Sequence, residues 1–303
     1  MITLVTNLRS WFFSRGDPRT AAALRIAFCG IYLFMIWDFH PVMHTLFDAG
    51  GLFGPPALDA SGSFSLGGFY RLAHGALLDK WYYASVLVTV LALVGYRTRW
   101  TLALTYGSLI LFQTRGNFVI FGADLVLRSC GLWLLFLRTD AVWAVDRLRS
   151  GNAASAIPDW PVKAVQIQCA LIYLITFLCK IGTRPWQDGS AVYYALQVGD
   201  VMFGQAFALL KPYHGVFPLL TYGSLVFEGA FPFLVFYRPT RNLALLSGVG
   251  FHMGIDVMMS IRFFALTMYL GYASFLTGAD WDWLATFAKK AVTRSSAAFR
   301  YAS

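Results

Sequence analysis

The sequence predicts an all-α integral membrane protein, a polytopic bundle of about eight transmembrane helices with short interfacial helices. Hydrophobic residues occupy 58% of the 303 positions and charged residues only 13%, whereas soluble domains carry about 25% charged residues. The mean hydropathy is +0.59, and the aromatic content of 17% suits helices with Trp and Tyr at both membrane interfaces. The apolar runs are too many and too long for one soluble core.

Apolar runs predict the transmembrane helices in order along the chain. Before them, residues 3–13 place apolar side chains at helical spacing, which predicts a short helix on the membrane surface. The spans are expected at residues 21–37, 81–95, 100–113, 118–137, 162–180, 217–237, 243–260 and 263–277. Gly199, Asp200 and Gly204 interrupt the apolar segment 190–210, so we expect a re-entrant or interfacial hairpin there.

We expect a single domain over residues 1–303, with its core at about 20–277 and a C-terminal tail at 278–303. In the tail, Trp and Phe side chains alternate with Lys and Arg, which is typical of an interfacial anchor. The first residues lack the basic segment and the small-residue cleavage site of a removed signal peptide. The hydrophilic link 138–161 is too short to mark a second domain.

The formal net charge of +9 comes from short clusters of Lys and Arg between the apolar runs. These clusters form no stripe with interleaved aromatic residues, so we expect the lipid bilayer as a partner and no nucleic acid. With eight spans, 15 of the 24 Lys and Arg residues fall on the side of both termini and 7 on the other. This bias predicts a multi-pass protein of the cell inner membrane with both termini in the cytoplasm. Lys180, Arg115 and Trp186 then lie on the periplasmic or lumenal side.

Common catalytic and metal-binding motifs are missing from the sequence. The four cysteines lie in apolar runs without CxxC or histidine spacing, so we expect no metal site. The chain contains no GxSxG, HExxH or Walker sequence. A transporter should show paired broken helices in two repeats, and no such internal symmetry is evident.

Lys180 is the leading candidate for chemistry because it closes an otherwise apolar helix. The apolar run from Cys169 ends at this lysine, and a Gly, a Pro, a Trp and an Asp-Gly turn follow at once. An ammonium at such a boundary either reaches the headgroups or is held inward by a carboxylate, a carbonyl or a ligand. Partial desolvation in the second case would make the lysine a usable base or nucleophile.

Other polar residues at membrane depth are expected to face one another, because facing lipid is costly. Asp124 and Arg128 stand four residues apart, so an ion pair on one helix face that fixes packing is one interpretation. Glu228 lies one turn before Pro232. In a structural interpretation, Pro232 kinks the helix and Glu228 forms a salt bridge to Arg25 or Arg128. In the alternative interpretation, Glu228 has a functional role.

His252 and Asp256 also stand one turn apart, in the span at 243–260. The carboxylate is placed to orient the imidazole as general-base pairs require, and a hydrogen-bonded packing histidine is the alternative. In the same span, the Gly250-x-x-x-Gly254 pattern predicts a close approach of two helices.

Four groups of residues, in order along the chain, resemble the vitamin-K-dependent γ-carboxylase-like family, also called the horizontally transferred transmembrane (HTTM) domain family. They cover most of the chain, from about residue 20 to 277. The groups are Arg115-Gly-Asn117 leading to Gly122-Ala-Asp-Leu-Val-Leu-Arg128; Asp140 to Asp146; Leu178-Cys-Lys180 followed by Trp186-Gln-Asp-Gly-Ser-Ala191; and Glu228-x-x-x-Pro232 ahead of Phe251-His-Met-Gly254.

The resemblance implies a lysine that deprotonates a reduced naphthoquinone so that it reacts with dioxygen. The strong base so formed removes a proton from peptidyl glutamate, which then takes up carbon dioxide. By position, Lys180 resembles that lysine, and His252 resembles a histidine of the family. The chain has Cys179-Lys180 where the carboxylase has adjacent lysines, and Asn117-Phe118 where it has Asn-His. The carboxylase's large lumenal domain has no counterpart after residue 277, so we do not expect glutamate carboxylation.

Two function hypotheses follow. In the first, the chain is a membrane enzyme that acts on a quinol or other lipid-soluble acid, with a reduced quinone as the implied cofactor. Lys180 is its base, His252 and Asp256 assist, and Arg115 or Arg262 stabilises an oxyanion. Further binding residues are expected at Asn117, Asp124, Arg128, Trp186 and Glu228. In the second, the protein is a non-enzymatic maturation or immunity partner of a secreted peptide, bound through the loop 38–80.

Overall fold

The computed structural model describes residues 2–48, 51, 75–115, 122–151, 156–197, 209–259, 261 and 263–301. About 80% of these residues are helical. The described residues also include the antiparallel two-residue strands β1 (Arg15–Gly16) and β2 (Ile157–Pro158). The main bundle consists of α2 (Pro18–Phe39), α5 (Ala76–Val94), α6 (Thr98–Arg115), α7 (Gly122–Leu134), α9 (Trp160–Ile181), α13 (Val216–Leu234), α14 (Arg238–Met259) and α15 (Phe264–Ala273).

Shorter or peripheral helices complete the described chain. They are α1 (Ile2–Phe12), the 3-10 helix η1 (His40–Val42), α3 (Met43–Phe47), α8 (Val145–Ser150), α10 (Arg184–Gln187), α11 (Ala191–Ala195) and α16 (Gly278–Tyr301). The helix predicted at 3–13 is present as α1, and its location on the membrane surface remains a prediction. Of the predicted hairpin at 190–210, the structure describes α11, whereas residues 198–208 lie outside the described residues.

Five helical segments of the described chain are long and apolar enough to cross a membrane: Pro18–Phe47, Ala76–Val94, Trp160–Ile181, Val216–Leu234 and Arg238–Met259. Helix α15 is apolar but shorter. The predicted class, an all-α protein with several membrane-spanning helices, is therefore confirmed. The more detailed prediction of about eight crossings remains a prediction.

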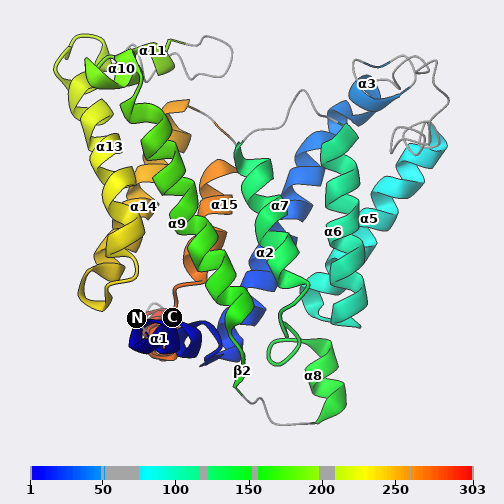
Figure 1. The fold of residues 1–303 in the computed structure, drawn as a ribbon. Helices are drawn as coiled ribbons and strands as arrows, with labels where there is room; N and C mark the ends of the chain where they lie inside the picture. Colours follow the sequence, from blue (N-terminus) through cyan, green and yellow to red (C-terminus); the bar gives the residue numbers. More distant parts are fainter. Residues whose placement is uncertain are drawn as a thin grey trace.

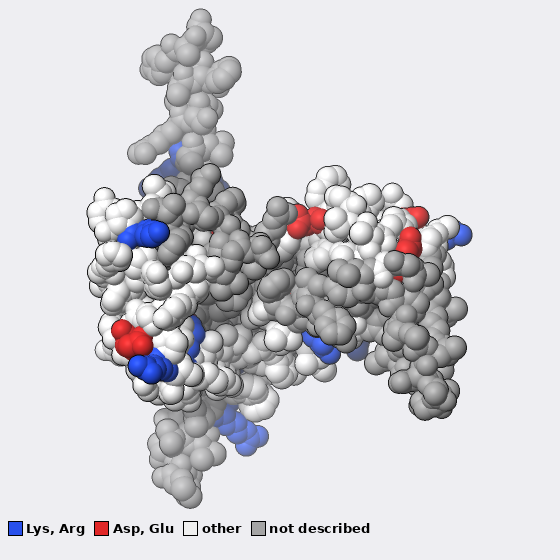
Figure 2. Space-filling view, turned by 90° about the horizontal axis from the view of Figure 1, so that it is seen from above, with Lys and Arg blue, Asp and Glu red and all other residues white. Residues whose placement is uncertain are grey.

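Helix α15 joins two halves of the bundle. It contacts α2 and α7 on one side and α9 and α14 on the other, while α13 packs against both α9 and α14. Figure 1 shows both chain ends at one end of the bundle, near α1, whereas α10 and α11 lie at the opposite end. Seen from that opposite end, the charged side chains of the described residues are few and lie in small groups (Figure 2).

Arg25 on α2 shows how the fold holds a charged side chain inside the bundle. Its side chain is fully buried, and Nη1 donates to the Thr139 carbonyl at 2.9 Å while Nη2 donates to the Trp143 carbonyl at 2.5 Å. The guanidinium thus ties α2 to the segment that follows α7, because a buried cation requires acceptors. The predicted pairing of Arg25 with Glu228 is wrong, since backbone carbonyls occupy the arginine.

Asp146 fixes the tight turn between α5 and α6. Its carboxylate accepts hydrogen bonds from the backbone N–H groups of Arg97 at 2.8 Å and Thr98 at 2.7 Å, and from the Thr98 hydroxyl at 2.9 Å. Arg97 has a positive φ of 44°, a conformation that costs free energy in a residue with a Cβ. The carboxylate therefore caps the start of α6 and holds this turn in place.

Replacing Asp146 with Asn should lower the stability of the protein by about 1 to 2 kcal/mol at neutral pH, because an NH2 group replaces one of the two carboxylate oxygens that accept hydrogen bonds from Arg97 and Thr98. Burial alone would raise the pKa of Asp146, but the hydrogen bonds from Thr98 and Arg97 outweigh burial and hold that pKa below its ordinary value. A lowered carboxyl pKa adds stability above the unfolded-state pKa of about 4 and loses it as the pH falls through the folded-state value. Thermal unfolding in detergent at several pH values should give melting temperatures of the wild type and Asp146→Asn that converge as the pH falls. Asp140→Asn is the control, because the contact of Asp140 with Arg138 is exposed and 3.7 Å long; an equal loss in both variants would contradict the capping role.

Candidate functional site

A pocket of about 480 Å³ lies among α9, α13, α14 and α15, below α10 and α11. Apolar side chains make up most of its wall, including Phe251, Ile255, Phe264 and Met268. The polar side chains on the wall are few and come from separate helices: Tyr173, Thr176, Lys180, Trp186, Ser224, Glu228 and His252. A mostly apolar cavity with a small number of convergent polar groups is the usual form of a small-molecule site.

Helical periodicity explains why α9 supplies three of the polar groups. Tyr173, Thr176 and Lys180 are spaced three and four residues apart, so their side chains share one face of the helix. On α13, Ser224 and Glu228 stand one turn apart and face them. The hydroxyls of Thr176 and Ser224 donate to the Ile172 and Leu220 carbonyls of their own helices.

The central polar contact joins Lys180 to Glu228. Lys180 Nζ lies 2.6 Å from Glu228 Oε1 and 4.4 Å from the centre of the Trp186 ring. The Glu228 side chain is 6% exposed and the Lys180 side chain 24%. Glu228 Oε2 has no hydrogen-bond partner in the described part of the chain. The lysine is therefore held inward by a carboxylate and an aromatic face, and the predicted pairing of Glu228 with Arg25 or Arg128 is replaced by this contact.

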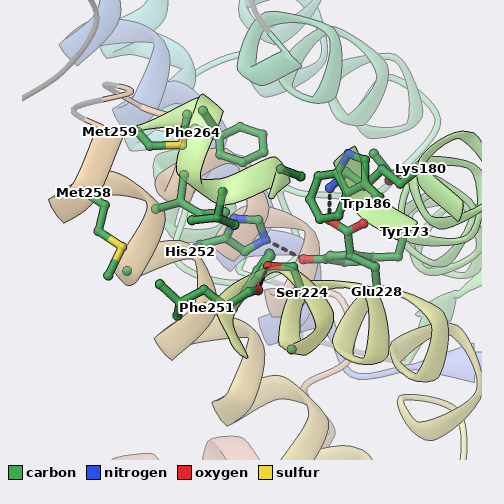
Figure 3. A pocket seen from close by; sticks show the side chains of 18 of the residues that line it. Tyr173, Lys180, Trp186, Ser224, Glu228, Phe251, His252, Met258, Met259 and Phe264 are labelled. Atoms are coloured by element: carbon green, nitrogen blue, oxygen red, sulfur yellow. Dashed lines mark hydrogen bonds and ion pairs between the residues drawn. The ribbon is translucent and has the colours of Figure 1, made fainter. Parts of the chain in front are cut away.

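A second polar group lies deeper in the pocket. Tyr173 Oη is 2.5 Å from His252 Nε2 and also forms a hydrogen bond with Tyr272 Oη. All three side chains are at least 95% buried. Figure 3 shows Tyr173 and His252 meeting across the pocket floor, with Lys180 and Glu228 nearby. Hydrogen bonds thus connect α9, α14 and α15 at this level.

The turn after Lys180 covers the outer end of the pocket. Thr221 of α13 donates its hydroxyl to the Gly189 carbonyl at 3.0 Å and accepts from the Val192 N–H at 3.1 Å. Gly189 has a φ of +82°, which suits glycine in this turn. Hydrogen bonds from Ser190 lower the pKa of Asp188 at the same turn. The motif at 186–191 therefore forms a folded cover that presents Trp186 to Lys180.

His252 and Asp256 are not paired as predicted. His252 Nε2 contacts Tyr173 instead, and neither His252 Nδ1 nor Asp256 Oδ1 has a partner among the described residues. Asp256 does not line the pocket. No described residue lies within 4 Å of a Cβ added at Gly250 or Gly254, so the described helices do not make the close approach that the Gly250-x-x-x-Gly254 pattern permits. Both glycines instead widen the pocket that they line.

Asp124 and Arg128 are not brought to the pocket. Asp124 and Arg128 lie on α7, outside its wall, and no ion pair joins their two side chains in the described structure. The Asp124 carbonyl accepts a hydrogen bond from Gln113 Nε2 at 3.0 Å. Asn117 and Arg262 lie outside the described residues, as does the side chain of Arg115. Their proposed roles stay predictions.

Sequence reasoning missed Tyr173 and Tyr272. A signal for Tyr173 was present, because it precedes Lys180 by seven residues and therefore shares its helix face. Tyr272 carried no such signal, since only the packing of α15 against α9 and α14 brings it to His252.

Comparison with known proteins shows to which family the chain belongs. The model of the HTTM domain matches residues 14–281. The chain belongs to the HTTM domain family. That family includes the membrane domain of the vitamin K-dependent carboxylase, so the resemblance found in the sequence is confirmed and the chain is a multi-pass membrane protein.

One curated relative is the Bacillus subtilis (strain 168) protein named "Uncharacterized protein YitO". It is 30% identical over 123 residues, which cover 38% of this HTTM chain and 39% of the relative. The match therefore spans about two fifths of that relative's length. No solved structure matches the chain.

We expect the hydrogen-bonded group of Tyr173, His252 and Tyr272 to form only when position 248 is a glycine. A Cβ at this position would overlap the Tyr272 hydroxyl and lie 2.6 Å from Tyr272 Cζ. Gly248→Ala should therefore destabilise the protein by about 1 to 3 kcal/mol, as overpacking does, and lower its melting temperature in detergent. The matched control is Gly250→Ala on the same helix, where the added methyl group has open space and should be neutral or slightly stabilising. Equal melting temperatures for the two variants would contradict this role of Gly248.

Proposed function

We propose that this HTTM protein is a membrane enzyme in which Lys180 acts as the base on a quinol or other lipid-soluble acid. The observation that supports the proposal most directly is the Lys180–Glu228 contact of 2.6 Å in a pocket with a mostly apolar wall. A pair of this kind is costly to bury, and the neighbouring Trp186 ring adds a further contact with the cation.

The chemistry of the pair suits proton abstraction. Lys180 and Glu228 together hold one acidic proton, either on the amine or on the carboxylate. The uncharged amine can take a proton from an acid in the pocket, and the resulting ammonium then stays beside the anion that has formed.

The pocket residues fit a reduced quinone. A flat apolar ring system would contact Phe251, Ile255 and Phe264, and its hydroxyl groups would find polar atoms at Glu228 and His252. Both side chains carry a buried polar atom without a partner in the described structure. A reduced quinone supplies acidic hydroxyl protons and two electrons when bound. Glutamate carboxylation is not part of this proposal.

The same proposal includes a topology. We propose that α2, α5, α6, α7, α9, α13, α14 and α15 all cross the membrane, within one domain whose core covers residues 20–277. The placement of both termini at one end of the bundle supports an even number of crossings (Figure 1). The excess of Lys and Arg on that side supports a cytoplasmic location. Lys180 and Trp186 then face the periplasm.

Replacing Lys180 with Met should reduce turnover about 100-fold or more, since a positioned base contributes at least this factor. The assay supplies menadiol and oxygen to the purified protein in nanodiscs and follows quinol consumption and product formation by chromatography. Lys211→Met is the matched control, because Lys211 is exposed and outside the pocket wall. Melting temperatures of both variants separate lost chemistry from lost folding. Equal, protein-dependent turnover in all three proteins would refute the role of Lys180.

A further inference from the structure

The directions of the hydrogen bonds at the pocket floor follow from counting protons. Tyr173 Oη has two partners, His252 Nε2 and Tyr272 Oη. The Tyr272 hydroxyl has Tyr173 as its one hydrogen-bond partner in the described chain. A tyrosine hydroxyl carries one proton to donate and can also accept. Tyr272 can therefore place its proton only on Tyr173.

Once Tyr272 donates to Tyr173, the Tyr173 proton must point to His252 Nε2. Reversing both bonds would leave the Tyr272 proton buried without an acceptor, which is unfavourable. Nε2 is thus the acceptor nitrogen of a neutral imidazole, so the proton of the ring lies on Nδ1. The two tyrosines together fix this tautomer.

The Nδ1–H group has no acceptor among the described residues, although His252 is only 2% exposed and lines the pocket. Glu228 Oε2 is a second buried polar atom on the same wall without a partner there. Tyr173 and Lys180 are seven residues apart on α9, about 10 Å along the helix axis. The pocket therefore offers a hydrogen-bond donor on its floor and a proton-holding pair nearer its outer end.

Charge limits what the pocket accepts. Lys180 is the one cationic side chain on its described wall, and Glu228 already neutralises it. Among the described residues, an anionic ligand would meet no free positive charge, and a cationic ligand would compete with Lys180 for one carboxylate. The site is thus suited to an uncharged ligand with an apolar body.

We infer that His252 Nδ1–H donates to an acceptor oxygen, a carbonyl or a hydroxyl oxygen, of an uncharged, lipid-soluble ligand whose other polar end faces the Lys180–Glu228 pair. Tyr173 and Tyr272 are positioning residues that hold His252 in the donor tautomer. This inference rests on the proposed function for the identity of the pocket as the substrate site. It adds an oxygen acceptor as a requirement for the ligand and assigns a role to two tyrosines.

The tautomer is tested without any ligand. Nitrogen-15 labelling of the five histidines, with His252→Phe to assign the signal, distinguishes the protonated from the unprotonated ring nitrogen by NMR. The wild type should carry its proton on Nδ1, and Tyr173→Phe should mix the two tautomers. Tyr269→Phe is the matched control, because Tyr269 donates to the Val249 carbonyl and does not line the pocket. A proton on Nε2 in the wild type would overturn the inference.

The ligand requirement is tested with two probes of nearly equal shape. 2-Acetylnaphthalene with a carbon-13 carbonyl should bind to the wild type with its infrared carbonyl stretch shifted to lower frequency than in empty micelles. Its binding should be at least tenfold tighter than that of 2-ethylnaphthalene, which lacks the oxygen. Both differences should disappear in His252→Phe and persist in Lys180→Met. An unshifted carbonyl, or equal binding of the two probes, would overturn the inference even if Lys180 proves catalytic.

Discussion

The ion pair between Lys180 and Glu228 is the interaction on which the arrangement of the pocket depends. It joins α9 to α13, and its carboxylate is almost completely buried. Removing one partner of such a pair leaves an uncompensated charge and costs about 3 to 5 kcal/mol, whereas two apolar side chains would pack there without that risk. A pair at this depth, beside a mostly apolar cavity, supports the proposal that Lys180 serves chemistry.

The pocket exists because small residues and short helices leave space beside this pair. Gly250 and Gly254 line the cavity where larger side chains would fill it, and α15 has only ten residues. At the same time, α15 brings Tyr272 to Tyr173 and His252, so one short helix connects both halves of the bundle and completes the hydrogen bonds of the pocket floor. The fold of the bundle and the hydrogen bonds of the pocket floor therefore both depend on the contacts of α15.

Much of the fold was predictable from the sequence, since runs of apolar residues report helices directly. Lys180 was also predictable, because a lysine that ends an apolar run is conspicuous. Its partner was not: the sequence suggested Arg25 or Arg128 for Glu228, and only tertiary packing, with Arg25 bound to two carbonyls, selects Lys180. The same limit applies to His252, because spacing along α14 favours Asp256 whereas the contact with Tyr173 comes from another helix.

The most direct test of the central claim, that this pocket holds a lipid-soluble acid beside Lys180, is mass spectrometry of the small molecules that co-purify with the protein in mild detergent. The comparison is between the wild type and Gly254→Trp, which fills the cavity from a position with open space. The account predicts that the wild type retains a compound with an apolar body and an acidic hydrogen, and that the filled variant loses it. Identical bound lipids in two equally folded proteins would contradict the account.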